Sequence, residues 1–262
     1  MPTMEKADPG AVLGIVGGMG PAAGVDLLQR VYRNTRAQRD QDHLSVILVS
    51  RSCGIQDRTE YLLHGGENPA YPIFGIVREL AAAGATVIGM PCNTAHALPI
   101  YSVLLKLITD NGLDVMLIDM IASVRDFVVD LAAKQRRVGL LATTGTISSA
   151  VYQSHFDGTD IEIVLPDNEL QRRLHDAIVD RSYGVKAASY PVTEKAKRAM
   201  FDTVRYLVDR CNADSVILGC TEIPLAFAGS EGHFGNLLVN PTEVLARAMV
   251  NAASPDRLLP IS

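Results

Sequence analysis

Short apolar runs alternate along the chain with longer segments in which apolar residues return every three to four positions. The runs are apolar at successive positions, as in strands that are buried on both faces. They lie at Val12–Val16, Val46–Ser50, Thr86–Met90, Val115–Ile118, Val138–Ala142, Ile161–Leu165, Ser215–Leu218 and Leu237–Val239. The longer segments have the helical period and include Ala23–Thr35, Tyr71–Ala83, Ile121–Ala133 and Lys195–Cys211. This alternation predicts a doubly wound α/β architecture with mainly parallel sheets and helices on both faces.

Two sequence patterns occur twice at nearly the same offset. An apolar run leads into a glycine- or threonine-rich turn at Gly14 and again at Gly139, 125 positions later. An apolar run followed by a cysteine and a nearby threonine occurs at Cys92 and again at Cys220, 128 positions later. We therefore expect two similar α/β lobes with the active site in the cleft between them, beyond the carboxyl ends of the strands. The expected bounds are residues 1–113 for the first lobe, completed by about 240–262, and 114–239 for the second.

The composition narrows the class of protein. The chain has 262 residues, of which 48% are hydrophobic, which is enough to build a substantial core. A net charge of −5 without a basic block argues against a nucleic acid as the main partner. No apolar stretch reaches the roughly 18–20 residues that span a bilayer, and the polar, acidic N-terminal segment does not match a signal peptide. Four cysteines without a CxxC pair favour free thiols and a cytoplasmic location.

Cys92 and Cys220 stand at matched strand ends, and this arrangement suits one kind of chemistry. Inverting a carbon requires a proton to leave one face and another to arrive at the opposite face, so each face needs its own acid–base group. A thiol titrates near pH 8.5, so one cysteine can be a thiolate while the other keeps its proton. Three hydroxyls beside the strand-end loops can hold a substrate carboxylate and the developing negative charge: Thr94, Thr144 and Thr221. Cys53 and Cys211 have no such match, and we expect them to be packing residues.

Two neighbouring motifs have simpler interpretations. Cys92 and His96 have the spacing of a nucleophile–base or metal pair, but no further His/Cys cluster follows, which argues against zinc. We expect His96 to cap or position the start of a helix instead. The segment Gly17–Pro21 lacks both the GxGxxG spacing and the lysine of a phosphate loop. It predicts a tight turn beside a ligand, with Pro21 as the first residue of a helix.

Three motifs, in this order, resemble the aspartate/glutamate racemase superfamily, and most closely its aspartate racemase branch. They are Gly-Gly-Met-Gly-Pro at 17–21, Pro-Cys-Asn-Thr-Ala-His at 91–96 and Gly-Cys-Thr-Glu at 219–222. The resemblance covers nearly the whole chain. It implies an amino-acid racemase that needs neither pyridoxal phosphate nor a metal, encloses its active site between two α/β lobes and forms a homodimer.

The resemblance also implies roles for individual residues. It makes Cys92 and Cys220 the two catalytic acid–base groups. It assigns the substrate's α-carboxylate and amino group to Asn93, Thr94 and Thr221, and it places Met19 on the cleft wall.

Two charged residues carry the expected substrate specificity. The family's Ile-Pro-Asp-Arg-Thr loop is matched by Ile55–Thr59, which makes Arg58 a carboxylate ligand. Lys186 matches the lysine that meets the side-chain carboxylate in aspartate racemases. Gln56 stands where the family has proline, Ala188 stands where glycine is common, and Arg-Ser-Cys at 51–53 replaces an Asn-Pro segment. The loop that contacts the substrate side chain therefore departs from the family pattern.

We expect a cofactor-independent racemase whose small-molecule substrate is an amino acid, aspartate before glutamate. Three alternatives remain open at this point: a glutamate or broad-specificity racemase, a related cysteine-dependent isomerase or decarboxylase, and a non-catalytic two-lobed binding protein. The retention of both cysteines argues against the single-cysteine enzymes.

Overall fold

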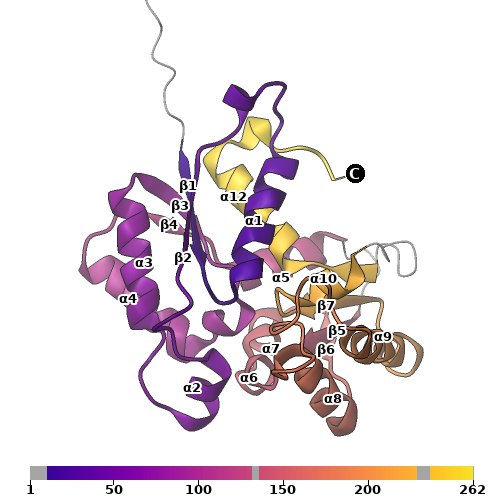
Figure 1. Ribbon diagram of the computed structural model, residues 1–262. Coiled ribbons are helices and arrows are strands. Elements are labelled where there is room, and N and C mark those ends of the chain that lie inside the picture. Colours follow the sequence, from indigo (N-terminus) through magenta and orange to yellow (C-terminus); the bar gives the residue numbers. More distant parts are fainter. Residues whose placement is uncertain (1–10, 132–135, 229–236, 262) are drawn as a thin grey trace, which may run out of the picture.

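The computed structural model describes residues 11–131, 136–228 and 237–261 (Figure 1). The N-terminal segment and the end of the expected helix 121–133 lie outside these residues. No helix in the described part of the chain is long and apolar enough to cross a membrane.

Eight strands form two four-stranded parallel sheets with the same relative strand order. The first sheet is ordered β2 (Val46–Ser50), β1 (Val12–Gly17), β3 (Ala85–Gly89) and β4 (Met116–Leu117). The second sheet is ordered β6 (Glu162–Val164), β5 (Arg137–Ala142), β7 (Ser215–Gly219) and β8 (Leu238–Val239). The predicted strands are confirmed, with small differences at their ends. The repeated strand order explains the repeated sequence patterns, because Gly14 and Gly139 lie in the equivalent strands β1 and β5.

The helices form three layers around the two sheets (Figure 1). One outer layer is α3 (Ala70–Ala82) and α4 (Leu98–Asp110), and the other is α8 (Asn168–Val179) and α9 (Glu194–Asp209). The middle layer is α1 (Pro21–Asn34), α5 (Met120–Leu131), α7 (Val151–Phe156) and α12 (Pro241–Ala253). Its buried residues share one apolar core with inner faces of both sheets, including Leu13 of β1 and Leu140 of β5.

The border between the two sheets differs from the expected lobe boundary. The strand that the boundary at 113/114 assigned to the second lobe is β4, and it pairs with β3 through Val87–Met116 and Ile88–Leu117. The reason is the crossover through α4, which returns the chain beside β3 and so completes the first sheet. α12 packs against α1 and β3, as expected for a C-terminal segment that completes the first lobe, and it also contacts α5. The division into two folding units itself stays a prediction.

Candidate active site

The two cysteine loops lie at the carboxyl ends of β3 and β7, the equivalent strands of the two sheets. Cys92 precedes a short 3-10 turn, Asn93–His96, and Cys220 directly follows β7. Only 5% of Cys92 and 6% of Cys220 is exposed. The Thr221 hydroxyl donates a hydrogen bond to the carbonyl of Pro91 at 3.2 Å. The residue after Cys220 is therefore hydrogen-bonded to the residue before Cys92, and the two loops lie against each other.

Glu222 is a buried carboxylate that touches both lobes. Its Oε2 accepts a hydrogen bond from the Cys220 thiol at 3.1 Å, and its Oε1 accepts one from the Gly20 backbone N–H at 3.0 Å. Burial raises the pKa of Cys220, and the negative charge of Glu222 raises it further, whereas Lys186 lowers it; the net shift is strongly upward. Glu222 closes the Gly-Cys-Thr-Glu motif at 219–222, but the sequence pattern assigned it no role. Its signal was an acidic residue two positions after a strand-end cysteine.

Arg58 is held beside Cys92 by the start of helix α2 (Arg58–His64). Asp57 caps this helix by accepting hydrogen bonds from two backbone N–H groups of its first turn. The Arg58 guanidinium donates to the carbonyls of Gln56 at 3.3 Å and Met19 at 3.4 Å. Burial would lower the pKa of Arg58, but the negative charges of Cys92 and Asp57 outweigh this effect and raise it. The Met19 side chain packs in the apolar core of the first lobe, which also contains Cys92.

Two buried hydrogen-bond donors near Cys92 have no acceptor among the described residues. They are Nε of Arg58 and Nδ2 of Asn93. Asn93 is 2% exposed, and its Oδ1 already accepts a hydrogen bond from the Tyr152 hydroxyl. An unpaired buried donor costs about 1–3 kcal/mol, so this pair of donors suits an oxygen-bearing ligand such as a carboxylate.

Lys186 lies at the mouth of the cleft and keeps access to solvent. Burial by surrounding protein would lower the pKa of Lys186, but the negative charge that Cys220 carries when it ionises and the charge of Glu222 raise it above the ordinary value. For Asp57, burial has the opposite effect and would raise the pKa, but the positive charge of Lys186 and the backbone N–H groups of α2 outweigh it and lower the pKa. The second lobe thus brings its lysine to the same place as the arginine of the first.

Thr94 and Thr144 both make hydrogen bonds within the protein. The Thr94 hydroxyl lies 2.8 Å from the Thr146 hydroxyl and 3.4 Å from that of Thr143, which links the two lobes behind the cysteines. Thr144 is half-buried, and its backbone N–H donates to Nδ1 of His175 at 3.2 Å. The sequence analysis missed Thr143 and Thr146, although both lie in the same turn after β5 as Thr144.

His96 supports the Cys92 loop through hydrogen bonds at both ring nitrogens. Its Nδ1 donates to the carbonyl of Cys92 at 2.9 Å, because a carbonyl can only accept. Its Nε2 accepts from the backbone N–H of Met120, the first residue of α5, at 3.3 Å. The ring is therefore neutral, in keeping with burial, which lowers the pKa of His96. The prediction that His96 positions the start of a helix is confirmed.

The two remaining cysteines differ in their exposure to solvent. Cys211 is half-buried against the core of the second lobe. Cys53 is exposed, so the expectation that it packs inside the protein was wrong. The reason is its place in the irregular loop between β2 and α2, whose side chains face solvent.

A cleft of about 1120 Å³ is lined by Arg58 and Lys186 among the expected site residues, whereas Cys92 and Cys220 are not among its lining residues. Residues of both lobes line it, including Gly20, Asp57, Arg58, Lys186 and Glu222. No cluster of three or more His, Cys, Asp or Glu side chains suited to a metal ion occurs among residues 11–131, 136–228 and 237–261.

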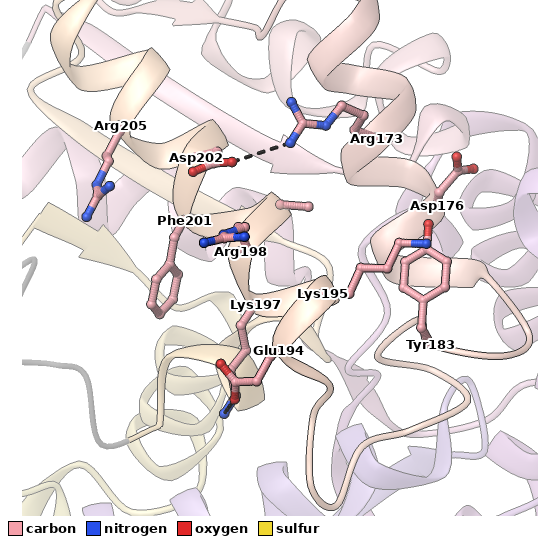
Figure 2. Close-up of a pocket in the computed structure, with 11 residues that line it drawn as sticks. Arg173, Asp176, Tyr183, Glu194, Lys195, Lys197, Arg198, Phe201, Asp202 and Arg205 are labelled. Atoms are coloured by element: carbon pink, nitrogen blue, oxygen red, sulfur yellow. Dashed lines mark hydrogen bonds and ion pairs between the residues drawn. The ribbon is translucent and has the colours of Figure 1, made fainter.

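A second hollow of about 740 Å³ lies on α8 and α9, on the outer face of the second lobe (Figure 2). Charged side chains dominate it and engage one another: Arg173 pairs with Asp202 at 3.3 Å, and Lys195 lies over the Tyr183 ring. None of the residues expected in the active site lines this hollow. The cleft between the lobes is therefore the candidate active site.

Comparison with known proteins defines the class. The family model described as Asp/Glu/Hydantoin racemase matches residues 16–249. The chain belongs to this family and is a racemase, an isomerase with the two-lobed α/β fold of its structural neighbours.

Individual relatives place the chain within the family. It is similar to the aspartate racemase of Picrophilus torridus, with 28% identity, a TM-score of 0.78 and coverage of 95% of this chain and 96% of that one. It is also 24% identical over 219 residues to the broad specificity amino-acid racemase RacX of Bacillus subtilis (strain 168), covering 81% of this chain and 86% of the relative. Glutamate racemase RacE1 of Bacillus anthracis shares the fold, with 17% identity, a TM-score of 0.61 and coverage of 92% of this chain and 81% of that one.

Proposed function

We propose that this racemase inverts the α-carbon of an acidic amino acid, aspartate before glutamate, with Cys92 and Cys220 as the two acid–base groups and without a cofactor. The observation that carries the proposal is the hydrogen bond from Thr221 to Pro91, which holds the two cysteine loops together from opposite lobes. A substrate between these loops presents one face of its α-carbon to each thiol. One cysteine removes the α-proton as the other delivers a proton to the opposite face.

The unpaired donors near Cys92 support a place for the substrate's α-carboxylate. Nε of Arg58 and Nδ2 of Asn93 both need an acceptor, and a carboxylate supplies two oxygens. Hydrogen bonds to this carboxylate also stabilise the negative charge that spreads onto it when the α-proton leaves. The same two donors therefore bind the substrate and favour its carbanion.

Lys186 supports an acidic side chain. It lines the same cleft as Arg58, so a substrate with two carboxylates can meet two cations there. The relative from Picrophilus torridus is named an aspartate racemase, which agrees with this assignment.

The size of the cleft favours a second candidate, a broad-specificity amino-acid racemase. A cleft of about 1120 Å³ is several times larger than aspartate and extends along α1 and α10 (Ile223–Phe227). Gln56, which replaces the family's proline, donates to the carbonyl of Gly65 at 3.1 Å and so reshapes the loop before Arg58. The Bacillus subtilis relative is named for broad specificity.

A panel of L- and D-amino acids in D2O tests both candidates. We expect L-aspartate to lose optical rotation while one deuterium enters at the α-carbon, in enzyme dialysed against chelator and without added pyridoxal phosphate. A requirement for a metal ion or for pyridoxal phosphate would contradict the two-cysteine racemase. Exchange of the α-proton without racemisation of any amino acid would contradict it as well. Release of CO2 would instead identify a decarboxylase, and faster turnover of neutral amino acids would favour broad specificity.

The resemblance to the family also supports a cytoplasmic homodimer. Sedimentation equilibrium of the purified chain tests the dimer, because a mass equal to one chain at micromolar concentration would contradict it.

A further inference from the structure

Glu222 stands out because it is buried, charged and in contact with the thiol of one proposed catalytic cysteine. It is 1% exposed, and each of its oxygens accepts a hydrogen bond from a different lobe. Oε2 faces Cys220 and lies 3.4 Å from the Thr221 hydroxyl, while Oε1 is held by Gly20. A carboxylate in this position disfavours a second negative charge on the adjacent sulfur.

Cys92 has the opposite surroundings. The cation Arg58 lies beside it, and this guanidinium interacts with the Cys92 sulfur. The two cysteines are equally buried, at 5% and 6% exposure, so accessibility does not distinguish them. The difference between them is the sign of the nearest charge.

We infer that Glu222 holds the proton on Cys220 in the substrate-free enzyme, so that Cys220 is the resting acid of the pair and Cys92, beside Arg58, is the resting base. The catalytic meaning of this assignment rests on the two-cysteine racemase proposed above. In the forward step the Cys92 thiolate takes the α-proton, the Cys220 S–H bond breaks, and its proton goes to the opposite face of the α-carbon. Cys92 is then the thiol and Cys220 the thiolate. The proton returns through solvent or through turnover of the other enantiomer.

Gly20 fixes the direction of the carboxylate. Its N–H holds Oε1, which leaves Oε2 aimed at the Cys220 sulfur. A Cβ atom at Gly20 would lie 2.5 Å from Oε1. Its φ of −101° is one that any residue adopts, so Gly20→Ala displaces the carboxylate without straining the backbone.

Three other ionisable groups face Cys220. Lys186 lowers the pKa of Cys220 and so favours its thiolate. Ionised Cys220 in turn contributes to raising the pKa of the buried Tyr152, after burial and Asp119. Cys92, from the first lobe, acts on Lys186 as Cys220 does. Burial raises the pKa of Cys220, and Glu222 adds to the effect while Lys186 opposes it, so the thiol is the favoured form of Cys220.

Alkylation by iodoacetamide at pH 7.5, with each modified cysteine located by mass spectrometry, tests the assignment without substrate. The variants are Glu222→Gln, which keeps the shape and removes the charge, and Gly20→Ala. Glu60→Gln is the control, since Glu60 is an exposed carboxylate on α2. The exposed Cys53 reports the reactivity of the reagent in every protein.

In the wild type we expect Cys92 to react at least about tenfold faster than Cys220, because a sulfur that keeps its proton is a poor nucleophile. Both test variants should raise the Cys220 rate about tenfold and change the Cys92 rate less than about twofold, whereas the control changes neither. Equal rates in the wild type, or an unchanged Cys220 rate in both folded variants, would overturn the inference. Because no turnover is measured, this result is independent of whether the racemase proposal succeeds, and thermal unfolding confirms that each variant is folded.

Discussion

The two cysteine loops have the same place in the fold but opposite electrostatic surroundings. Cys92 follows β3 and Cys220 follows β7, which occupy equivalent positions in the two sheets. Arg58 lies beside the first cysteine and Glu222 beside the second. The repeated architecture thus places one cysteine after the equivalent strand of each sheet. The neighbours that are not repeated decide how each thiol behaves.

The structural support of the two loops also differs. His96 ties the Cys92 loop to the start of α5. The Cys220 loop is instead tied across the cleft to the other lobe, through Thr221 and Glu222. The Cys92 loop thus has the additional support of His96, while both loops take part in contacts between the lobes.

The largest effect is expected from removing either thiol. Cys92→Ser and Cys220→Ser should each reduce racemisation at least about 1000-fold, because an alcohol is a far weaker acid than a thiol and general acid–base catalysis contributes about 10²–10⁴-fold. Each pKa unit of mismatch costs about 1.36 kcal/mol. Optical rotation measures the loss, and Cys53→Ser, a change in an exposed loop, should have normal activity. Near-normal racemisation by either serine variant would mean that the two loops do not act as a pair.

A smaller effect is expected from the cation that the second lobe adds to the cleft. Lys186→Ala should weaken turnover of aspartate at least about tenfold, since a charge-assisted hydrogen bond contributes about 1.5–3 kcal/mol. Any slow activity on alanine or serine should barely change, because these substrates have no side-chain carboxylate. Lys195→Ala is the matched control, since that lysine lies over Tyr183 on the outer face. The acidic-substrate assignment fails if the wild type prefers a neutral amino acid. It also fails if Lys186→Ala leaves the ratio of aspartate turnover to alanine or serine turnover unchanged.

The smallest effect is expected from the anchor of the Cys92 loop. His96→Leu removes both ring nitrogens, which leaves the Met120 N–H without its partner and the Cys92 carbonyl with only the hydrogen bond from the Ala95 N–H, so we expect the free energy of unfolding to fall by about 1–3 kcal/mol. The displaced loop should also lower kcat severalfold, with a smaller change in KM. Urea unfolding and steady-state kinetics measure the two effects. His64→Leu, at a side chain that is 69% exposed, should change stability by less than about 0.5 kcal/mol. An unchanged kcat in a destabilised His96 variant would limit this residue to a structural role.

The amino-acid sequence by itself determined the strands, the two-lobed α/β architecture and the two matched cysteines. These features depend on local information, because apolar runs and helical periods are read from neighbouring residues. The offset between Cys92 and Cys220 extended that information over half the chain, since a repeated fold repeats its sequence pattern.

Only the tertiary structure decided which groups surround each sulfur. Glu222 reaches Gly20, Thr94 meets Thr146, and Thr221 reaches Pro91 across separations of 202, 52 and 130 residues. No periodicity in the sequence encodes such contacts, because they depend on how two lobes pack around α5 and α12. The pKa of a buried thiol depends on charges within a few ångströms, whatever their distance along the chain. The sequence therefore predicted two matched cysteines as the proposed catalytic pair, and the packing of the lobes set a cation beside Cys92 and an anion beside Cys220.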